Sequence, residues 1–114
     1  MSFIDDKTRI HHIFDAILKL ERFSQGRKRE DLDSDDMLLF AMMKALELAG
    51  EAASRISPEF KSQHSEIPWK EIITIRNRLI HGYFDIDHDI LWNIFTSDIP
   101  SFKSKLEVII KNFG

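Results

Sequence analysis

Apolar residues recur at helical spacing along most of this chain, and this periodicity constrains the fold more than any other feature. The first apolar stripe has the i, i+3, i+4, i+7, i+8 spacing of one helix face and consists of Ile10, Ile13, Phe14, Ile17 and Leu18. It predicts a helix that runs to about Phe23. No segment shows sustained period-two alternation, so we expect an all-α fold, an up-down bundle of four to five helices.

Capping side chains and prolines divide the rest of the chain into further helices, because a side-chain oxygen before a helix accepts from its free N–H groups. A second helix is expected to begin within residues 34–36 and to end at residues 57–58, followed by a short turn over 59–63. A third helix is expected from Pro68 to a C-cap at Gly82. Asp87 is expected to cap a fourth helix, and Asp98 with Pro100 to open a fifth. Residues 25–33 show no apolar periodicity and are expected to form an exposed connection. Gly50 lies among alanines inside the second helix, which predicts a close approach to another helix.

The length and composition are those of one ordinary globular domain spanning residues 1–114. The chain has no cysteine, which excludes disulfides and thiol chemistry and allows a reducing compartment, so a cytoplasmic location is expected. Its N-terminus lacks the features of a signal peptide, and no apolar stretch approaches the roughly 20 residues of a membrane span. A formal net charge of -3 argues against binding nucleic acid by bulk electrostatics, so any such contact must be local.

The segment from Arg76 to Tyr83 holds the candidate functional residues. Arg76 and His81 are separated by four residues. Arginine keeps its charge and binds phosphate with a planar fork, while histidine exchanges a proton near neutral pH, so together they suggest chemistry on a phosphodiester. Residues five positions apart on an ideal helix are rotated by about 140°, so the helix must be interrupted near His81. A left-handed C-cap at Gly82 would let His81 sit in the last helical turn and face the groove that Arg76 lines.

Metal-free RNA cleavage needs a base, an acid and positive charge against the transition state. One histidine and one arginine supply half of this set, so we expect a two-fold dimer, with an interface through the third helix, to supply the rest. Asn77 could orient His81 or donate to a phosphate oxygen, and Arg78 could steer phosphate. On spacing alone, a structural explanation is favoured over a catalytic one: Arg76 as a salt-bridge or helix-capping residue, His81 as a satisfied polar residue at a helix end, and Tyr83 as a packing aromatic.

The ordered set of motifs resembles the HepT-like branch of the HEPN superfamily. The Arg-x4-His-x-Tyr signature at 76–83 carries the resemblance, and the segments 46–53, 67–72, 82–87, 91–92 and 98–100 agree with it. The resemblance implies a HEPN-like helical bundle and a metal-independent ribonuclease toxin that forms a homodimer and needs no cofactor. It also implies that Arg76 and His81 are catalytic, that Asn77 is the polar residue beside the arginine, and that Tyr83 receives AMP from a minimal nucleotidyltransferase antitoxin. The RNA target, tRNA or mRNA, is left open.

Two other interpretations remain. The first is a non-catalytic helical subunit that binds a partner nucleotidyltransferase or its nucleotide. The second is a metal-binding bundle, which is disfavoured because the paired Glu-x-x-His motifs of a di-metal site are absent; its ligands would come from His11, His12, Asp15, Glu47, Glu51, His64 and His88. We expect Glu51 to form an ion pair with an arginine, His11 and His12 to lie at a surface, and the basic run 27–29 to be a solvated loop.

Overall fold

The computed structural model describes residues 5–81 and 85–113. The elements in chain order are α1 (Asp6–Ser24), α2 (Asp31–Ser34), α3 (Asp36–Ser54), α4 (Pro58–Gln63), α5 (Trp69–Ile73), α6 (Ile75–Leu79), β1 (Ile80–His81), β2 (Asp85–Ile86), α7 (His88–Asn93), the π-helical turn η1 (Ile94–Asp98) and α8 (Ile99–Lys111). The predicted all-α architecture is confirmed, apart from a two-stranded hairpin.

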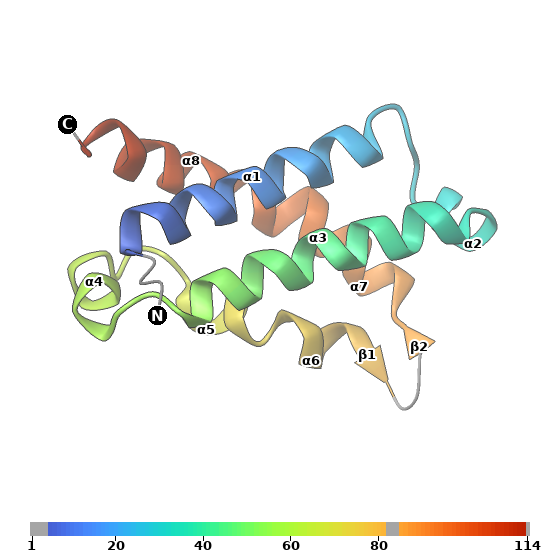
Figure 1. Cartoon of the computed structure of the whole chain (residues 1–114). Coiled ribbons are helices and arrows are strands. Elements are labelled where there is room, and N and C mark those ends of the chain that lie inside the picture. The colour runs from blue at the N-terminus through green and yellow to red at the C-terminus, as the bar shows by residue number, and fades with distance from the viewer. Residues whose placement is uncertain (1–4, 82–84, 114) are drawn as a thin grey trace.

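The two longest helices, α1 and α3, pack against each other in antiparallel directions and form the centre of the bundle (Figure 1). Helix α8 packs on α1, while α5 and α6 follow one side of α3. The largest fully buried side chains lie where these helices meet and are Ile10, Ile13, Ile17, Leu20, Leu32, Met42, Leu46, Leu79, Leu91, Ile94 and Leu106. Most of the first predicted stripe is therefore core, as helix periodicity requires.

Two helices begin where the capping chemistry predicted, α3 within the expected start 34–36 and α7 after Asp87. Asp35 accepts a hydrogen bond from the Leu38 N–H at 3.1 Å and starts α3. Ser57 caps α4, with Pro58 at its first position, and Asp87 caps α7. Because each cap satisfies an N–H that has no partner within the helix, these boundaries depend on local chemistry and were accessible from the sequence.

Gly50 lies where α3 comes close to the backbone of α5. A Cβ built at this position would lie 2.9 Å from the Ile72 carbonyl oxygen, which is closer than real Cβ atoms come. The expected close helix approach at Gly50 is confirmed. Glycine is needed here to bring the α5–α6 segment against α3.

The third predicted helix is wrong in two respects. It is interrupted at Thr74, which separates α5 from α6, and it ends at Leu79 rather than continuing to Gly82. The run from Ile72 to Ile75 consists entirely of β-branched residues, whose restricted χ1 angles disfavour the α-helix. Beyond Leu79 the chain pairs with itself as an antiparallel hairpin, with Ile80 opposite Ile86 and His81 opposite Asp85.

The fourth and fifth predicted helices are joined rather than separate. Residues 88–111 form one helical stretch in which the π turn η1 links α7 to α8. A proline inside an α-helix clashes with the carbonyl four residues before it, and the wider turn just before Pro100 relieves that contact. The buried face of this stretch continues across η1, because Ile94 and Ile99 are both buried although they are five positions apart.

The expected exposed connection at 25–33 is also only partly correct. It contains the short helix α2, and the side chain of Leu32 within it is fully buried. The turn before α2 has Gly26 in the left-handed region, with φ of 73°.

Within residues 5–81 and 85–113, no helix combines the length and the apolarity that crossing a membrane would demand.

Candidate active site

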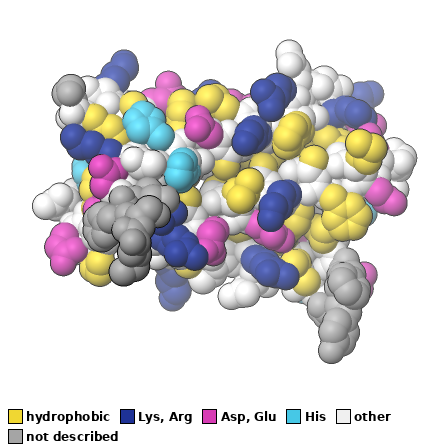
Figure 2. Space-filling model, viewed as in Figure 1, with side chains coloured by type: hydrophobic (Ala, Val, Ile, Leu, Met, Phe, Trp, Pro, Cys, Tyr) yellow, Lys and Arg dark blue, Asp and Glu magenta, His cyan; other side chains and the backbone are white. Residues whose placement is uncertain are grey.

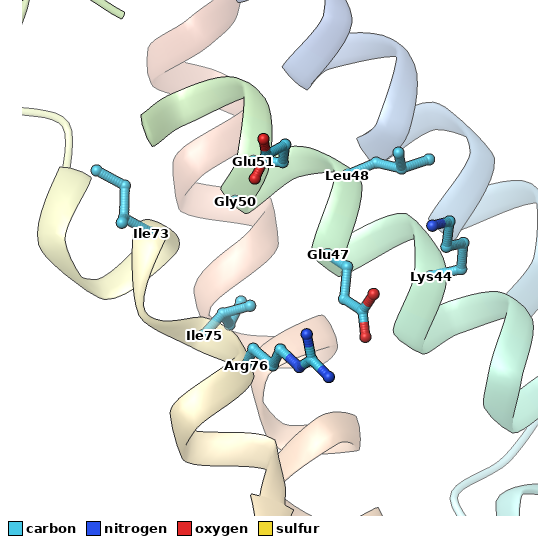
Figure 3. A pocket seen from close by; sticks show the side chains of 8 residues that line it. All are labelled: Lys44, Glu47, Leu48, Gly50, Glu51, Ile73, Ile75 and Arg76. Atoms are coloured by element: carbon cyan, nitrogen blue, oxygen red, sulfur yellow. The ribbon is translucent and has the colours of Figure 1, made fainter. Parts of the chain in front are cut away.

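Arg76 lines a cavity between α3 and the α5–α6 segment. The cavity has a volume of about 320 Å³ and is lined by Lys44, Glu47, Leu48, Gly50, Glu51, Ile73, Ile75 and Arg76. The Arg76 side chain extends toward α3, and Glu47 points toward it from the other side (Figure 3). Among the residues that the structure describes, no carboxylate forms a salt bridge with Arg76. Its guanidinium is therefore available to an anion that enters the cavity.

The position of Arg76 follows from the buried side chains on either side of it. Ile75 and Leu79 anchor α6 in the core, and Ile72 anchors α5. With these three side chains pointing inward, Arg76 is turned outward along the rim of the cavity and remains exposed. The Thr74 interruption sets this direction, because α6 begins a new helical phase at Ile75.

His81 lies outside this cavity, in strand β1. Its side chain is 60% exposed, and its Nε2 lies 3.3 Å from Oδ2 of Asp87. The expectation that His81 occupies the last helical turn and faces the groove of Arg76 is therefore wrong for a single chain. The helix ends two residues earlier, and pairing with β2 carries His81 onto the hairpin instead.

Asn77 and Arg78, the two polar residues between the catalytic candidates, do not line the cavity of Arg76. Asn77 is exposed on α6. Arg78 forms an ion pair with Asp98, with its Nη1 3.4 Å from Oδ2. It lines a separate cavity of about 420 Å³, between α5–α6 and the η1–α8 segment. Arg76 and Arg78 therefore face different cavities, and only Arg76 faces α3.

Tyr83, the predicted modification site, and Gly82, the predicted C-cap, lie outside the described residues. Both fall between β1 and β2 in the sequence. The described part of the hairpin ends at His81 on one side and resumes at Asp85 on the other.

The comparisons with known proteins agree with the helical architecture. A family model described as ribonuclease HepT-like matches residues 13–109. A probable ribonuclease HepT of Thermococcus cleftensis is 41% identical over 105 residues, which cover 92% of this chain and 96% of the relative. A protein of Methanocaldococcus jannaschii, provisionally named an RNase, is 33% identical over 109 residues, covering 96% of this chain and 100% of the relative. The chain belongs to the HepT-like ribonuclease family. No solved structure matches it significantly.

The HepT-like domain carries two groups near the candidate residues that sequence reasoning did not assign to the site. Lys44 adds a second positive charge to the Arg76 cavity, and Glu47 adds a carboxylate. A signal for both existed, because Lys44, Glu47 and Glu51 have the three- and four-residue spacing of one helix face. Glu51 itself pairs with Arg55 at 2.8 Å, which confirms the expected ion pair.

Asp87 is the third group that was missed in this role, although its capping function was predicted. The pKa of Asp87 is lowered from 3.8, first by the hydrogen bond from the Ile90 backbone N–H and then by His81. The carboxylate is therefore ionised at neutral pH and faces the imidazole as a negative charge. No local pattern joins residues 81 and 87, so only the hairpin could reveal this contact.

Several of the remaining charged groups of the HepT-like domain form ion pairs with one another. The basic run contains two ion-paired arginines, since Arg27 binds Asp35 at 3.1 Å and Arg29 binds Asp33 and Asp89 at 2.8 Å and 2.6 Å. His11 and His12 are exposed, as expected. Figure 2 shows basic, acidic and hydrophobic side chains intermixed over the α1–α3 face, with no field of a single sign. This agrees with a local rather than a bulk electrostatic contact with nucleic acid.

Proposed function

We propose that this chain is a metal-independent endoribonuclease toxin of a toxin–antitoxin pair. In this proposal, Arg76 and His81 form a composite site at a homodimer cleft, and a cognate minimal nucleotidyltransferase silences the toxin by transferring AMP to Tyr83. The observation that carries the proposal is that Arg76 lines a cavity and that its guanidinium has no carboxylate partner among the described residues. The chain that carries this cavity belongs to a ribonuclease family.

The chemistry needs no group beyond protein side chains. A base removes the proton of the RNA 2′-hydroxyl, the 2′-oxygen attacks phosphorus, the bond from phosphorus to the 5′-oxygen breaks, and an acid protonates the leaving oxygen. His81 is suited to proton transfer, and Arg76 to the charge that develops on the phosphoryl oxygens. The products are a 2′,3′-cyclic phosphate and a 5′-hydroxyl end.

A second copy of the chain would complete this set. His81 is not among the residues that line the Arg76 cavity, so a composite site has to bring the two together across an interface. Helix α3 lines the cavity and also exposes Met37, Phe40 and Leu48, with 84%, 59% and 42% of these side chains accessible. Large apolar groups of this kind are enriched in protein interfaces. A two-fold dimer through α3, rather than through the third predicted helix alone, would bury them beside the cavity.

The control by AMP transfer follows the same electrostatic logic. Tyr83 is two residues beyond His81, so an attached AMP would place a negative phosphate near the residues that must bind RNA. It would block the site by occupancy and by charge. If Tyr83→Phe were neutralised as fully as wild type by the partner enzyme and ATP, this control mechanism would be excluded.

The test of the activity is cleavage of total RNA and tRNA by wild type, Arg76→Ala and His81→Ala in the presence of EDTA. We expect a loss of about 10²- to 10³-fold in kcat for Arg76→Ala and of about 10²- to 10⁴-fold for His81→Ala. His88→Ala is the matched control, because this histidine pairs with Asp33 away from the cavity. Absence of a 2′,3′-cyclic product from wild type, or equal cleavage by His81→Ala, would favour the non-catalytic partner-binding subunit instead.

Mixing the two inactive variants tests whether the site is composite. A heterodimer of Arg76→Ala and His81→Ala chains retains one site with both native residues only if each site combines residues of two chains. We therefore expect partial recovery of activity after the variants are unfolded together and refolded. If each chain carried a complete site of its own, no recovery would occur.

A further inference from the structure

Asp87 is held in place by three hydrogen-bonding or ionic contacts. Its backbone N–H donates to the Leu79 carbonyl oxygen at 2.7 Å, which closes the hairpin against the end of α6. Its Oδ1 accepts from the Ile90 N–H at 3.0 Å as the cap of α7. Its Oδ2 lies 3.3 Å from Nε2 of His81. With the backbone and one carboxylate oxygen already fixed, the other oxygen has little freedom to leave the imidazole.

Asp87 and His81 differ in exposure: the residue that would hold the imidazole is the less exposed one, and the imidazole that would exchange a proton is the more exposed one. The Asp87 side chain is 30% exposed and the His81 side chain 60% exposed. Asp87 therefore belongs to the body of the domain, whereas most of the imidazole surface faces outward. Asn77, the residue first considered for orienting His81, is exposed on α6, and its backbone N–H donates to Thr74.

We infer that Asp87 is the positioning residue for His81, holding the proton on Nε2 so that Nδ1 is the atom that exchanges a proton with RNA. The inference rests on the proposed ribonuclease function. A neutral imidazole carries its proton on one nitrogen and a lone pair on the other, and a carboxylate beside Nε2 keeps the proton there. Nδ1 then accepts the proton of the 2′-hydroxyl, and the carboxylate stabilises the imidazolium that forms. The 3.3 Å contact can shorten at that moment, as catalytic hydrogen bonds often do once substrate is bound.

Asp87→Asn separates this role from the structural one. Asparagine caps helices as well as aspartate does, so α7 should form normally while the negative charge beside His81 is lost. Asp87→Ser keeps a capping oxygen but is too short to reach the imidazole. Asp33→Asn is the matched control, because it removes a carboxylate that lies 2.7 Å from Nδ1 of His88, a histidine outside the proposed site.

The expected result is a decrease in kcat of about tenfold or more for Asp87→Asn and Asp87→Ser, with an unchanged KM, unchanged dimerisation and a Tm close to that of wild type. Asp33→Asn should cleave RNA at the wild-type rate. Activity of Asp87→Asn equal to wild type, in a protein that His81→Ala inactivates, would overturn the inference and leave the proposed function standing.

Imidazole nitrogen NMR provides a readout that does not depend on activity. In ¹⁵N-histidine protein at a pH where the ring is neutral, the His81 signals, assigned with His81→Ala, should show a protonated Nε2 and an unprotonated Nδ1. Asp87→Asn should shift His81 toward a mixture of tautomers, while Asp33→Asn should leave it unchanged. A protonated Nδ1 in wild type, or no change in Asp87→Asn, would refute the inference even if the protein proved not to cleave RNA.

Discussion

Gly50→Ala should destabilise the protein although alanine is the better helix former. In an open helix interior this change would stabilise by about 1 kcal/mol. Here the new methyl group would lie 2.9 Å from the Ile72 carbonyl oxygen, and this neighbour is backbone, which cannot rotate away. Forcing an extra methyl into a packed contact costs about 1–3 kcal/mol. The net change is a destabilisation of about 0–2 kcal/mol.

This free energy translates into a measurable shift of the melting temperature. With an unfolding entropy of about 2.1 cal/mol/K per residue and 114 residues, each 1 kcal/mol corresponds to about 4 °C in Tm. We therefore expect the Tm of Gly50→Ala to lie up to about 8 °C below that of wild type, measured by calorimetry or circular dichroism. Activity should fall as well, since moving Ile72 also moves the segment that carries Arg76.

Gly26 provides the control for this reasoning. It has a φ of 73°, and a Cβ there would meet no atom within 4 Å. Gly26→Asn should be tolerated, because asparagine adopts the left-handed region readily, whereas Gly50→Asn should be worse than Gly50→Ala. A Tm for Gly50→Ala about 4 °C above wild type would match helix propensity alone and would refute the close approach.

Two further predictions concern the surface networks. Asp6→Ala removes the carboxylate that accepts from the Ser57 N–H at 2.9 Å and from its hydroxyl at 2.6 Å, so denaturant titration should show a loss of about 1–2 kcal/mol; an unchanged midpoint would contradict this role. The pKa of Asp33 is lowered from 3.8, first by the hydrogen bond with His88 and then by Arg29. Because a lowered folded-state pKa stabilises above the unfolded value, the Tm advantage of wild type over Asp33→Asn should be present at about pH 5 and disappear as the pH falls below 3.8. A pH-independent difference would show that ionisation of Asp33 is not its source.

The features that could be predicted from the sequence depend on local chemistry. The cap at Asp87 and the start of α3 within 34–36 were predicted, because a cap acts on an N–H only three residues away. Gly50 was recognisable because glycine is costly inside a helix and so indicates a packing requirement. The family signature placed Arg76 and His81 in one motif, and the structure gives Arg76 a cavity.

The features that could not be predicted depend on competition between local preference and the rest of the fold. The β-branched run ending at Ile75 was visible, but whether it breaks a helix depends on the packing of Ile72 and Leu79 against α3. The hairpin was not visible, because strands of two residues are too short to show alternation. The contact of His81 with Asp87 depends on that hairpin, so the sequence suggested Asn77 in its place.

The π turn η1 also bears on how this chain can vary in length. Ile94 and Ile99 share the buried face although five positions separate them, so the turn accommodates one residue more than an α-helical turn would. Removing one residue between them would leave a four-residue spacing that an ordinary α-helical turn satisfies, with both isoleucines still inward. A one-residue deletion elsewhere in α8 would rotate every later side chain by about 100°. Related chains could therefore differ by a single residue at η1 and keep the same core.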